Sequence, residues 1–299
     1  MIDYIKAVVR DANIDKNKKI DWCETTNTET GEILNITGTT SCFKICKKKS
    51  GLYVIEGSLH KLSNGGFHNC NDLDYASVVR SIEHLSDLLE VRPSSIELSN
   101  VEFGVNLLTS EPSETYINQT IGYRTKAFNV YHPDKHPNTI GKTSKHSQFI
   151  LKIYQKTHEN NGVVHYLLRF ENKAKTMEFL HKKGIPIRTL ADLGVKDNLA
   201  AMGKVLINSF DQLIMIDKIW FENIKNLEEK DILYNYTGNW EAMCPTKTNF
   251  TNNRDYNQAR KKYYGERKML TDIICKYGLN ELHNEVKKKI ADKVQCMLN

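Results

Sequence analysis

Two short segments near the middle of the chain alternate apolar and polar residues, and this alternation constrains the fold most strongly. The segments are Phe149–Lys156 and Tyr166–Glu171. Side chains two apart on a strand share a face, so such alternation is typical of a strand with one buried and one polar side. The turn sequence Glu159–Gly162 lies between the segments. We therefore predict two paired strands joined by this turn.

The polar side of these two strands carries an unusual combination of groups. Lys152, Tyr154 and Lys156 point the same way on the first strand, and Arg169 and Glu171 share a face on the second. Nearby cations favour the phenolate form of a tyrosine, and arginine can hold a phosphate oxygen. We therefore predict that Tyr154 is a nucleophile toward a phosphodiester, with Lys156 and Arg169 as further catalytic residues.

The rest of the amino-terminal part adds more strands and two helices. Strand patterns occur at 2–10, 34–47, 52–62 and 95–108, and helical patterns occur at 73–90 and near 113–123. Strands joined by short or helical returns predict an α+β fold, with an antiparallel-rich central sheet and helices on one face.

Helical patterns dominate after Glu171. They cover 199–224, 255–277 and 279–298, so we predict an all-helical C-terminal region. We place a catalytic domain at 1–190 and a helical region with a DNA-binding role at 191–299.

Composition limits the class of protein and its partners. The formal net charge of +6 and the isoelectric point near 8.8 suit an anionic partner such as nucleic acid. No apolar run approaches the roughly 20 residues of a membrane span, and the first residues do not resemble a signal peptide. The seven cysteines lack the spacing of a disulfide framework or a zinc site. We therefore expect a cytoplasmic protein without a membrane partner.

Three glutamates on three predicted strands are the strongest chemical signal. Glu56, Glu102 and Glu171 each directly follow an apolar residue of their strand. A carboxylate on an inward strand face is destabilising unless it is paired or bound to a metal, and carboxylate oxygens suit Mg²⁺ or Mn²⁺. Glutamates on the wet face of an antiparallel sheet are also common. Sequence alone leaves open whether the three share one sheet face.

Several catalytic motifs are absent from the sequence. There is no Gly-x-x-x-x-Gly-Lys-Ser/Thr loop and no Gly-x-Ser-x-Gly elbow. These absences argue against a P-loop ATPase and an α/β-hydrolase. The chain also lacks the His-hydrophobic-His pair with which one large class of tyrosine nicking enzymes holds its metal.

Four segments resemble, in order and spacing, the motifs of a known family. They are Tyr53–Lys61, Val101–Asn106, Leu151–Lys156 and Leu168–Glu171. The family is that of the filamentous-phage gene II and X type replication initiators, which look related to plasmid rolling-circle initiators. The resemblance covers about residues 50 to 190.

The resemblance implies an enzyme that nicks one DNA strand at an origin and later rejoins it. Tyr154 would attack a phosphodiester, form a 5′-phosphotyrosine and release a 3′-hydroxyl as primer. Glu56, Glu102 and Glu171 would bind the divalent metal, although the middle acid is an aspartate in some relatives. The expected partners are origin DNA as a single strand or supercoiled duplex, host helicase and polymerase, and a second copy of the chain.

Basic residues in two regions are candidates for contacts with DNA. The set comprises His60, Lys61, Lys152, Arg260, Lys261 and Lys262. Segment 254–268 is basic with interleaved tyrosines, which fits phosphate contacts and equally fits a solvated helix face with core tyrosines. Tyr263 and Tyr264 are a rival nucleophile pair, but no acidic cluster accompanies them.

Two other functions remain open at this point. One is a DNA-binding protein without catalysis, acting at an origin or operator. The other is a tyrosine transposase or mobilisation relaxase, which would apply the same chemistry to different DNA.

Overall fold

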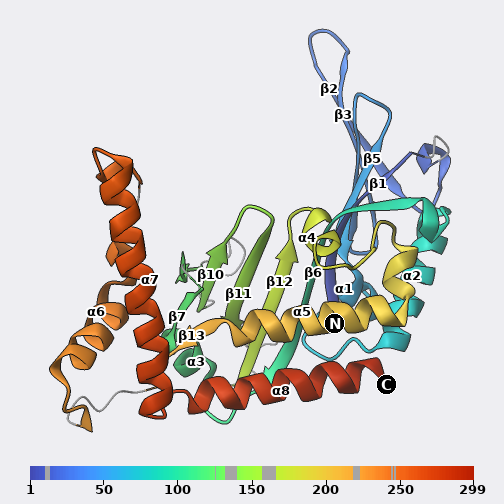
Figure 1. Cartoon of the computed structure of the whole chain (residues 1–299). Helices are drawn as coiled ribbons and strands as arrows, with labels where there is room; N and C mark the ends of the chain where they lie inside the picture. The colour runs from blue at the N-terminus through green and yellow to red at the C-terminus, as the bar shows by residue number, and fades with distance from the viewer. Residues whose placement is uncertain are drawn as a thin grey trace.

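The computed structural model describes residues 1–10, 14–124, 126–131, 140–156, 166–217, 223–243, 245 and 247–299. A ten-stranded sheet forms the centre of the molecule, and every pairing within it is antiparallel. Helices lie against one of its faces (Figure 1). The predicted α+β class is confirmed.

The strands of the large sheet run in the order β2-β3-β4-β5-β1-β6-β12-β11-β10-β9. Their bounds are β1 Ile2–Val9, β2 Asp21–Thr26, β3 Ile33–Thr40, β4 Phe43–Lys47, β5 Tyr53–Ser58, β6 Ile96–Leu108, β9 Asn129–Val130, β10 Gly141–Lys145, β11 Phe149–Gln155 and β12 Leu167–Ala174. A second sheet has three short strands, β13 Leu213–Met215, β7 Thr120–Tyr123 and β8 Lys126–Ala127.

The helices are α1 Leu59–Ser63, α2 Tyr75–Leu89, α3 Ser113–Gln119, α4 Glu178–His181, α5 Lys196–Asp211, α6 Leu227–Met243, α7 Asn253–Lys276 and α8 Glu281–Leu298. Side-chain caps begin two of the long ones. Asp74 accepts the backbone N–H of Ser77 at the start of α2, and Asn252 accepts that of Asp255 at the start of α7. Such caps satisfy N–H groups that have no partner within the helix.

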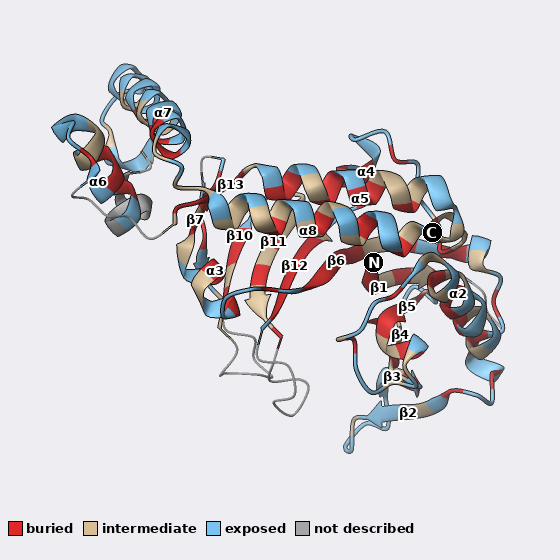
Figure 2. Ribbon diagram, turned by 90° about the horizontal axis from the view of Figure 1, so that it is seen from below, coloured by how far each residue is buried: buried red, intermediate tan, exposed pale blue. Residues whose placement is uncertain are grey.

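Helices α5 and α8 lie side by side across the apolar face of the sheet (Figure 2). Leu151, Ile153 and Phe170 are completely buried, and the Phe170 ring packs edge-on against Phe210 of α5. The alternation of β11 and β12 thus places their apolar residues under the helices. Their polar residues consequently point to the opposite face.

Two hydrophobic clusters divide the molecule. The larger one joins the sheet to α2, α5 and α8, and the smaller one joins α6 and α7 to Ile214, Ile216 and Ile224. The helical C-terminal region is confirmed, apart from the short strand β13. The expected boundary after residue 190 falls inside the larger cluster, because α5 and α8 return to the sheet.

Most predicted elements agree with the structure, with differences at their ends. Strands β11 and β12 pair as expected, and the predicted turn at 159–162 lies outside the described residues. The predicted strand at 52–62 is wrong beyond Ser58, where α1 begins. The hydroxyl of Ser58 accepts the backbone N–H of Lys61 at 3.0 Å and starts the helix.

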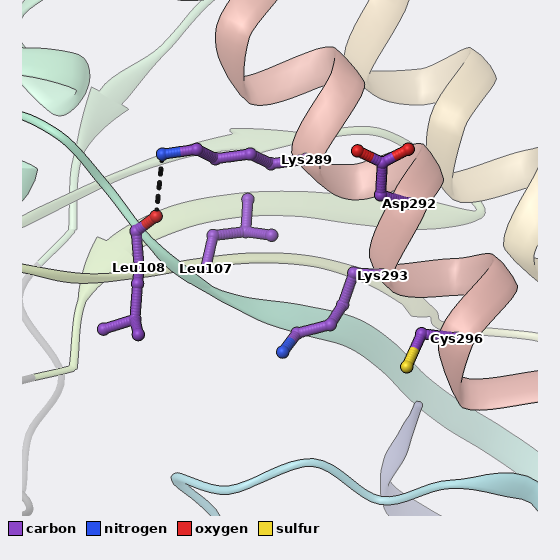
Figure 3. Close-up of a pocket in the computed structure, with 6 residues that line it drawn as sticks. All are labelled: Leu107, Leu108, Lys289, Asp292, Lys293 and Cys296. Carbon is purple, nitrogen blue, oxygen red and sulfur yellow. Dashed lines mark hydrogen bonds between the residues drawn. The ribbon is translucent and has the colours of Figure 1, made fainter.

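An open hollow of about 330 Å³ lies between the end of β6 and α8 (Figure 3). Its lining is Leu107, Leu108, Lys289, Asp292, Lys293 and Cys296, so it contains none of the predicted site residues. None of the helices that the structure describes combines the length and the apolar composition of a membrane span.

Two glycines on the polar face lie opposite residues that the sequence predicts to be part of the functional site. Gly104 of β6 faces Glu171, and Gly141 of β10 faces Tyr154. A Cβ at Gly104 would lie 2.5 Å from the carbonyl oxygen of Phe170 and 2.6 Å from Cβ of Glu171. A Cβ at Gly141 would lie 2.7 Å from Cβ of Tyr154. Each glycine therefore leaves room for its neighbour's side chain.

Gly104→Ala should lower the free energy of unfolding by about 1–3 kcal/mol, because the new methyl group overpacks a rigid backbone contact. Gly265→Ala in α7 is the matched control, since a Cβ there meets nothing within 4 Å. It should raise stability by about 0.5–1 kcal/mol through helix propensity. Urea unfolding followed by circular dichroism measures both. Equal stability of the Gly104 variant and the wild type would contradict the packing argument.

Candidate functional site

The pairing register of β6, β11 and β12 places the predicted site residues of these strands on one face of the sheet. Lys152 of β11 pairs with Glu171 of β12, and Tyr154 pairs with Arg169. Arg169 pairs in turn with Asn106 of β6. Directly paired residues of antiparallel strands point to the same side. The alternation in the sequence is thus converted into one continuous polar surface.

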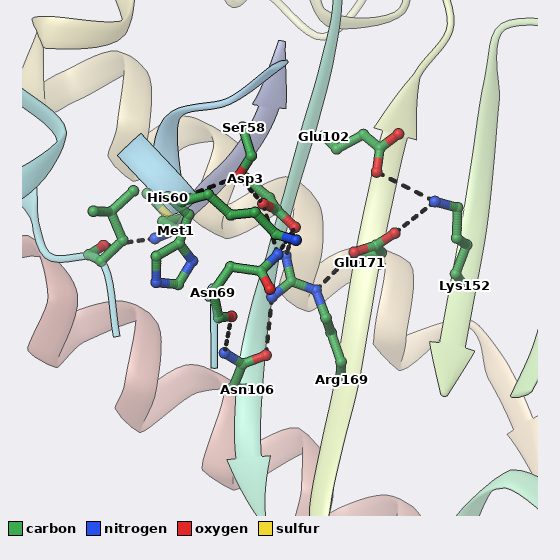
Figure 4. Close-up of polar contacts among 12 residues, drawn as sticks. Met1, Asp3, Ser58, His60, Asn69, Glu102, Asn106, Lys152, Arg169 and Glu171 are labelled. Carbon is green, nitrogen blue, oxygen red and sulfur yellow. Dashed lines mark hydrogen bonds and ion pairs between the residues drawn. The ribbon is translucent and has the colours of Figure 1, made fainter. Parts of the chain in front are cut away.

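Glu171 is the centre of this polar surface (Figure 4). Its Oε1 accepts a hydrogen bond from Nζ of Lys152 at 2.7 Å, and its Oε2 accepts one from Nε of Arg169 at 2.7 Å. The hydroxyl of Tyr154 also donates to Oε2, at 3.1 Å. The residue is 1% exposed, so these three donors replace water around its carboxylate.

A second carboxylate holds the far side of Arg169. Nη2 donates to Oδ2 of Asp3 at 2.6 Å, and Nη1 donates to Oδ1 of Asn106 at 2.9 Å. Asp3 also accepts from the hydroxyl of Ser58 at 2.7 Å and from the amide of Asn69 at 2.8 Å. All three nitrogens of the guanidinium are therefore engaged, and the arginine has a single defined orientation.

The charges in this cluster stabilise one another. Burial raises the pKa of Glu171, but the adjacent Lys152 and Arg169 outweigh it and hold the pKa well below its usual range. Burial likewise opposes the effect of Arg169 and Lys156 on Asp3, whose pKa is also lowered. For Lys152, the two carboxylates outweigh burial and raise the pKa. These three groups are therefore ionised at neutral pH.

Glu102 joins the cluster through lysines. Nζ of Lys152 lies 3.2 Å from Oε2 of Glu102 as well as 2.7 Å from Oε1 of Glu171, and Lys173 pairs with Oε1 of Glu102. One ammonium group thus contacts an oxygen of each carboxylate. The two glutamates are close enough for a single cation to bind both.

Glu56 lies on the same polar face but apart from the other two glutamates. It forms an ion pair with Lys6 at 3.1 Å. Strand β1 separates β5 from β6, which puts roughly 10 Å between the two strand axes. Tyr4 belongs to β1, and burial together with the charges of Glu56 and Glu102 raises its pKa.

The fit of a divalent metal rests on Glu102 and Glu171. In the part of the chain that the structure describes, no three histidine, cysteine, aspartate or glutamate side chains lie together as a metal site. Mg²⁺ is commonly held by one or two carboxylates with waters and substrate phosphate. The pair bridged by Lys152 meets that requirement, with the ammonium as a stand-in cation.

Lys156 is 2% exposed and lies near the ring of Tyr154. Its Nζ is 5.9 Å from the centroid of the Tyr154 ring, and its charge lowers the pKa of Asp3. Lys152, Lys156 and Arg169 therefore place positive charge around the half-buried phenol. The structure thus brings together Tyr154, Lys156, Arg169, Lys152, Glu102 and Glu171, which the sequence singled out.

The position of His60 differs from the expected one. The sequence placed it on a strand beside Ser58, whereas it lies in α1 and is 4% exposed. Its Nε2 is 2.9 Å from Oδ1 of Asn71. Burial and the charge of Arg169 lower its pKa to about 3, so the ring is neutral. It offers no charge to a phosphate, and its neighbour Lys61 is half-buried.

The predicted basic residues of α7 lie at the surface. Arg260, Lys261 and Lys262 are all exposed, so each of the three charges reaches solvent. The guanidinium of Arg260 lies 5.5 Å from the ring centroids of both Tyr256 and Tyr264, one helical turn to either side. The rival nucleophile Tyr263 is buried, whereas Tyr264 is exposed on this basic side.

Several residues of the cluster were not identified from the sequence. They are Asp3, Asn69 and Tyr131, whose ring lies 6.0 Å from that of Tyr154. The only signal for Asp3 was an acid within a largely apolar strand. The others become visible only when strand order is known.

No protein-family model matches the chain, and no curated protein sequence matches it. Among solved structures, it is similar to that of the rolling circle replication initiator protein from Geobacillus stearothermophilus. The TM-score is 0.43 at 10% identity, over 81% of this chain and 96% of the other.

The free energy of unfolding should fall as the pH is lowered below about 4. The pKa values of Asp3 and Glu171 are lowered on folding, from ordinary values of about 4. Their stabilisation is complete above the unfolded-state pKa and is lost as pH falls through the folded-state pKa. Urea unfolding between pH 7 and pH 3 measures the slope.

Asp3→Asn should flatten this slope, because one linked carboxylate is removed. Glu83→Gln, at an exposed position on α2, is the control and should leave the slope unchanged. An Asp3 variant with the wild-type slope would contradict the assignment of the pH dependence to this cluster.

Proposed function

We propose that this protein nicks and rejoins one DNA strand, with Tyr154 as nucleophile, to initiate rolling-circle replication. One observation carries the proposal. The hydroxyl of Tyr154 donates to a buried, ionised carboxylate within a cluster of lysine and arginine side chains. A phenol oriented in this way among cations is suited to attack on an anionic phosphodiester.

The reaction is a transesterification in both directions. The phenolic oxygen of Tyr154 attacks phosphorus, and a new phosphorus–oxygen bond forms as the bond to the 3′ oxygen of the preceding nucleotide breaks. The phenol loses its proton and the leaving oxygen gains one, giving a 5′-phosphotyrosine and a free 3′-hydroxyl. The reverse attack by a 3′-hydroxyl reseals the strand. Because the number of phosphoester bonds is conserved, no ATP is required.

The roles of the neighbouring residues follow from their contacts. Glu171 accepts the hydrogen bond from Tyr154 and orients its oxygen. Lys152 and Lys156 supply the positive charge that favours phenolate and phosphate. Arg169 acts as a positioning residue, since its three nitrogens are engaged by Glu171, Asn106 and Asp3.

Glu102 and Glu171 would hold the divalent ion, Mg²⁺ or Mn²⁺, that the resemblance implies. When bound, such an ion neutralises charge on a phosphoryl oxygen. Glu56 is the third expected ligand, but it pairs with Lys6, and strand β1 separates its strand from that of Glu102. We therefore assign the metal to the two-carboxylate site.

The DNA would run from the polar face of the sheet to the basic side of α7. Arg260, Lys261 and Lys262 are available for phosphate contacts, and the tyrosines beside Arg260 offer faces for base stacking. Origin DNA, host helicase and polymerase, and a second copy of the chain are the partners in this proposal, in the cytoplasm of a phage or plasmid host.

Two other functions can be distinguished from the proposed one by experiment. A DNA-binding protein without catalysis would use α7 but would form no covalent product. A transposase or mobilisation relaxase would form the same phosphotyrosine on different DNA. A gene carried by a small circular phage or plasmid would favour replication over transposition.

Tyr154→Phe should reduce the covalent protein–DNA adduct by at least about 10³-fold, the scale on which removal of a nucleophile acts. The test mixes the protein with Mn²⁺ and single-stranded or supercoiled DNA that carries the origin of its own replicon. A denaturing gel resolves the adduct. Tyr264→Phe, at the exposed rival tyrosine, is the control and should form the adduct normally.

An adduct that survives Tyr154→Phe would remove this residue from the mechanism. Complete absence of an adduct with the wild-type protein on its cognate origin would favour the function without catalysis.

Replacement of Arg260, Lys261 and Lys262 by alanine should weaken DNA binding uniformly across sequences. The slope of log affinity against log salt should become shallower by about 0.7–0.9 for each phosphate that the variant no longer neutralises. Fluorescence anisotropy with labelled single-stranded DNA between about 50 mM and 200 mM salt measures this slope. Lys48→Ala with Lys49→Ala, in an exposed turn, is the control. An unchanged slope would show that α7 does not bind DNA.

A further inference from the structure

We propose that the ammonium group of Lys152 occupies the divalent-cation position between Glu102 and Glu171, and that a bound cation displaces it toward the phosphate attacked by Tyr154. This inference rests on the proposed function. It assigns to Lys152 a role as an exchangeable internal counter-ion, beyond a contact with DNA.

The geometry of the pair defines the position. Nζ of Lys152 lies 2.7 Å from Oε1 of Glu171 and 3.2 Å from Oε2 of Glu102. A hard cation that bridges two carboxylates takes one oxygen from each in the same way, at shorter distances. The ammonium and the metal would therefore occupy the same space between the same two oxygen atoms.

The remaining oxygens of the pair are also engaged. Oε2 of Glu171 accepts from Arg169 and Tyr154, and Oε1 of Glu102 accepts from Lys173. A divalent ion can therefore enter between the two glutamates only when the bridging ammonium of Lys152 leaves. Like charges at such short range repel strongly in a poorly solvated site, so the ammonium and the metal exclude each other.

Lys152 is the donor that can leave. Arg169 is 2% exposed and fixed by Asp3 and Asn106, so it cannot turn away without breaking both contacts. The side chain of Lys152 is 13% exposed and has a flexible four-carbon stem. Lys173 pairs with Glu102 at its other oxygen. Among the residues that the structure describes, Lys152 is the one whose ammonium bridges the two glutamates.

The released ammonium would remain near the reaction. Lys152 and Tyr154 are two residues apart on one strand face, about 7 Å along the strand. Nζ already lies 5.8 Å from the ring centroid of Tyr131, which packs against Tyr154. Cation entry would thus free one positive charge for a phosphate oxygen beside the nucleophile, which couples metal binding to DNA binding.

The test measures Mn²⁺ binding to the full-length protein without DNA, by isothermal titration calorimetry and by the decrease of the free Mn²⁺ electron paramagnetic resonance signal. Lys152→Met keeps the apolar stem but removes the charge. It should bind Mn²⁺ at least about tenfold more tightly than wild type, because the competing cation is gone. Lys173→Met is the matched control, and its affinity should change by less than about threefold, since Lys173 does not occupy the bridging position.

Two further variants keep the test decisive. Lys152→Arg retains a competing cation and should bind Mn²⁺ about as weakly as wild type. Glu102→Gln in the Lys152→Met background should abolish the tighter binding. Thermal unfolding monitored by circular dichroism confirms that each variant is folded and should show a larger Mn²⁺-induced rise in melting temperature for Lys152→Met.

Equal gains from Lys152→Met and Lys173→Met would overturn the proposal, because they would indicate a general charge effect rather than displacement. Unchanged or weaker Mn²⁺ binding by a folded Lys152→Met variant would overturn it as well. These outcomes do not depend on whether Tyr154 is the nucleophile, because the covalent adduct is measured in a separate experiment on DNA.

Discussion

The buried ion pairs of Arg169 determine how the polar face is built. One guanidinium on β12 links Glu171 on its own strand to Asp3 of β1, which lies 166 residues before the arginine in sequence. An isolated buried arginine would be strongly destabilising, and each carboxylate would be equally unfavourable without it. The orientation of Glu171, and through it that of Tyr154, therefore depends on Arg169 being fully engaged.

This network divides the site into a rigid part and an adjustable part. Gly104 and Gly141 let the backbone approach closely beneath Glu171 and Tyr154, and the guanidinium holds the carboxylate from the side. Lys152 is more exposed than Arg169, and its long stem lets the ammonium move. A reaction that must bind, cleave, hold and reseal a strand needs a nucleophile with constant geometry and counter-charges that can be rearranged. The two parts of the cluster meet these separate requirements.

Alternation was sufficient to predict β11 and β12, and to predict that Lys152 and Tyr154 share a face of one strand and Arg169 and Glu171 a face of the other, because residue parity on a strand is a local property. The strand order is not local. Whether Glu56 reaches Glu102 depends on β1 lying between their strands, and no pattern in residues 52–62 contains that information. Asp3 was missed for the same reason, since its partner is supplied by a distant strand. His60 was misplaced because Ser58, which continues the strand pattern, also begins a helix.

The burial of so many charges bears on the choice between an enzyme and a protein that only binds DNA. A buried ion-pair network contributes little net stability, and well-packed apolar side chains in its place are often as stable or more so. A sheet that served only to support a basic helix would gain nothing from ionised groups at Glu171, Asp3 and Arg169. Contact with DNA through α7 would not require them either, because its basic side belongs to a helix of the second hydrophobic cluster. Carboxylates with perturbed pKa values concentrate at functional sites, so this burial favours the proposed enzyme over a protein that only binds DNA.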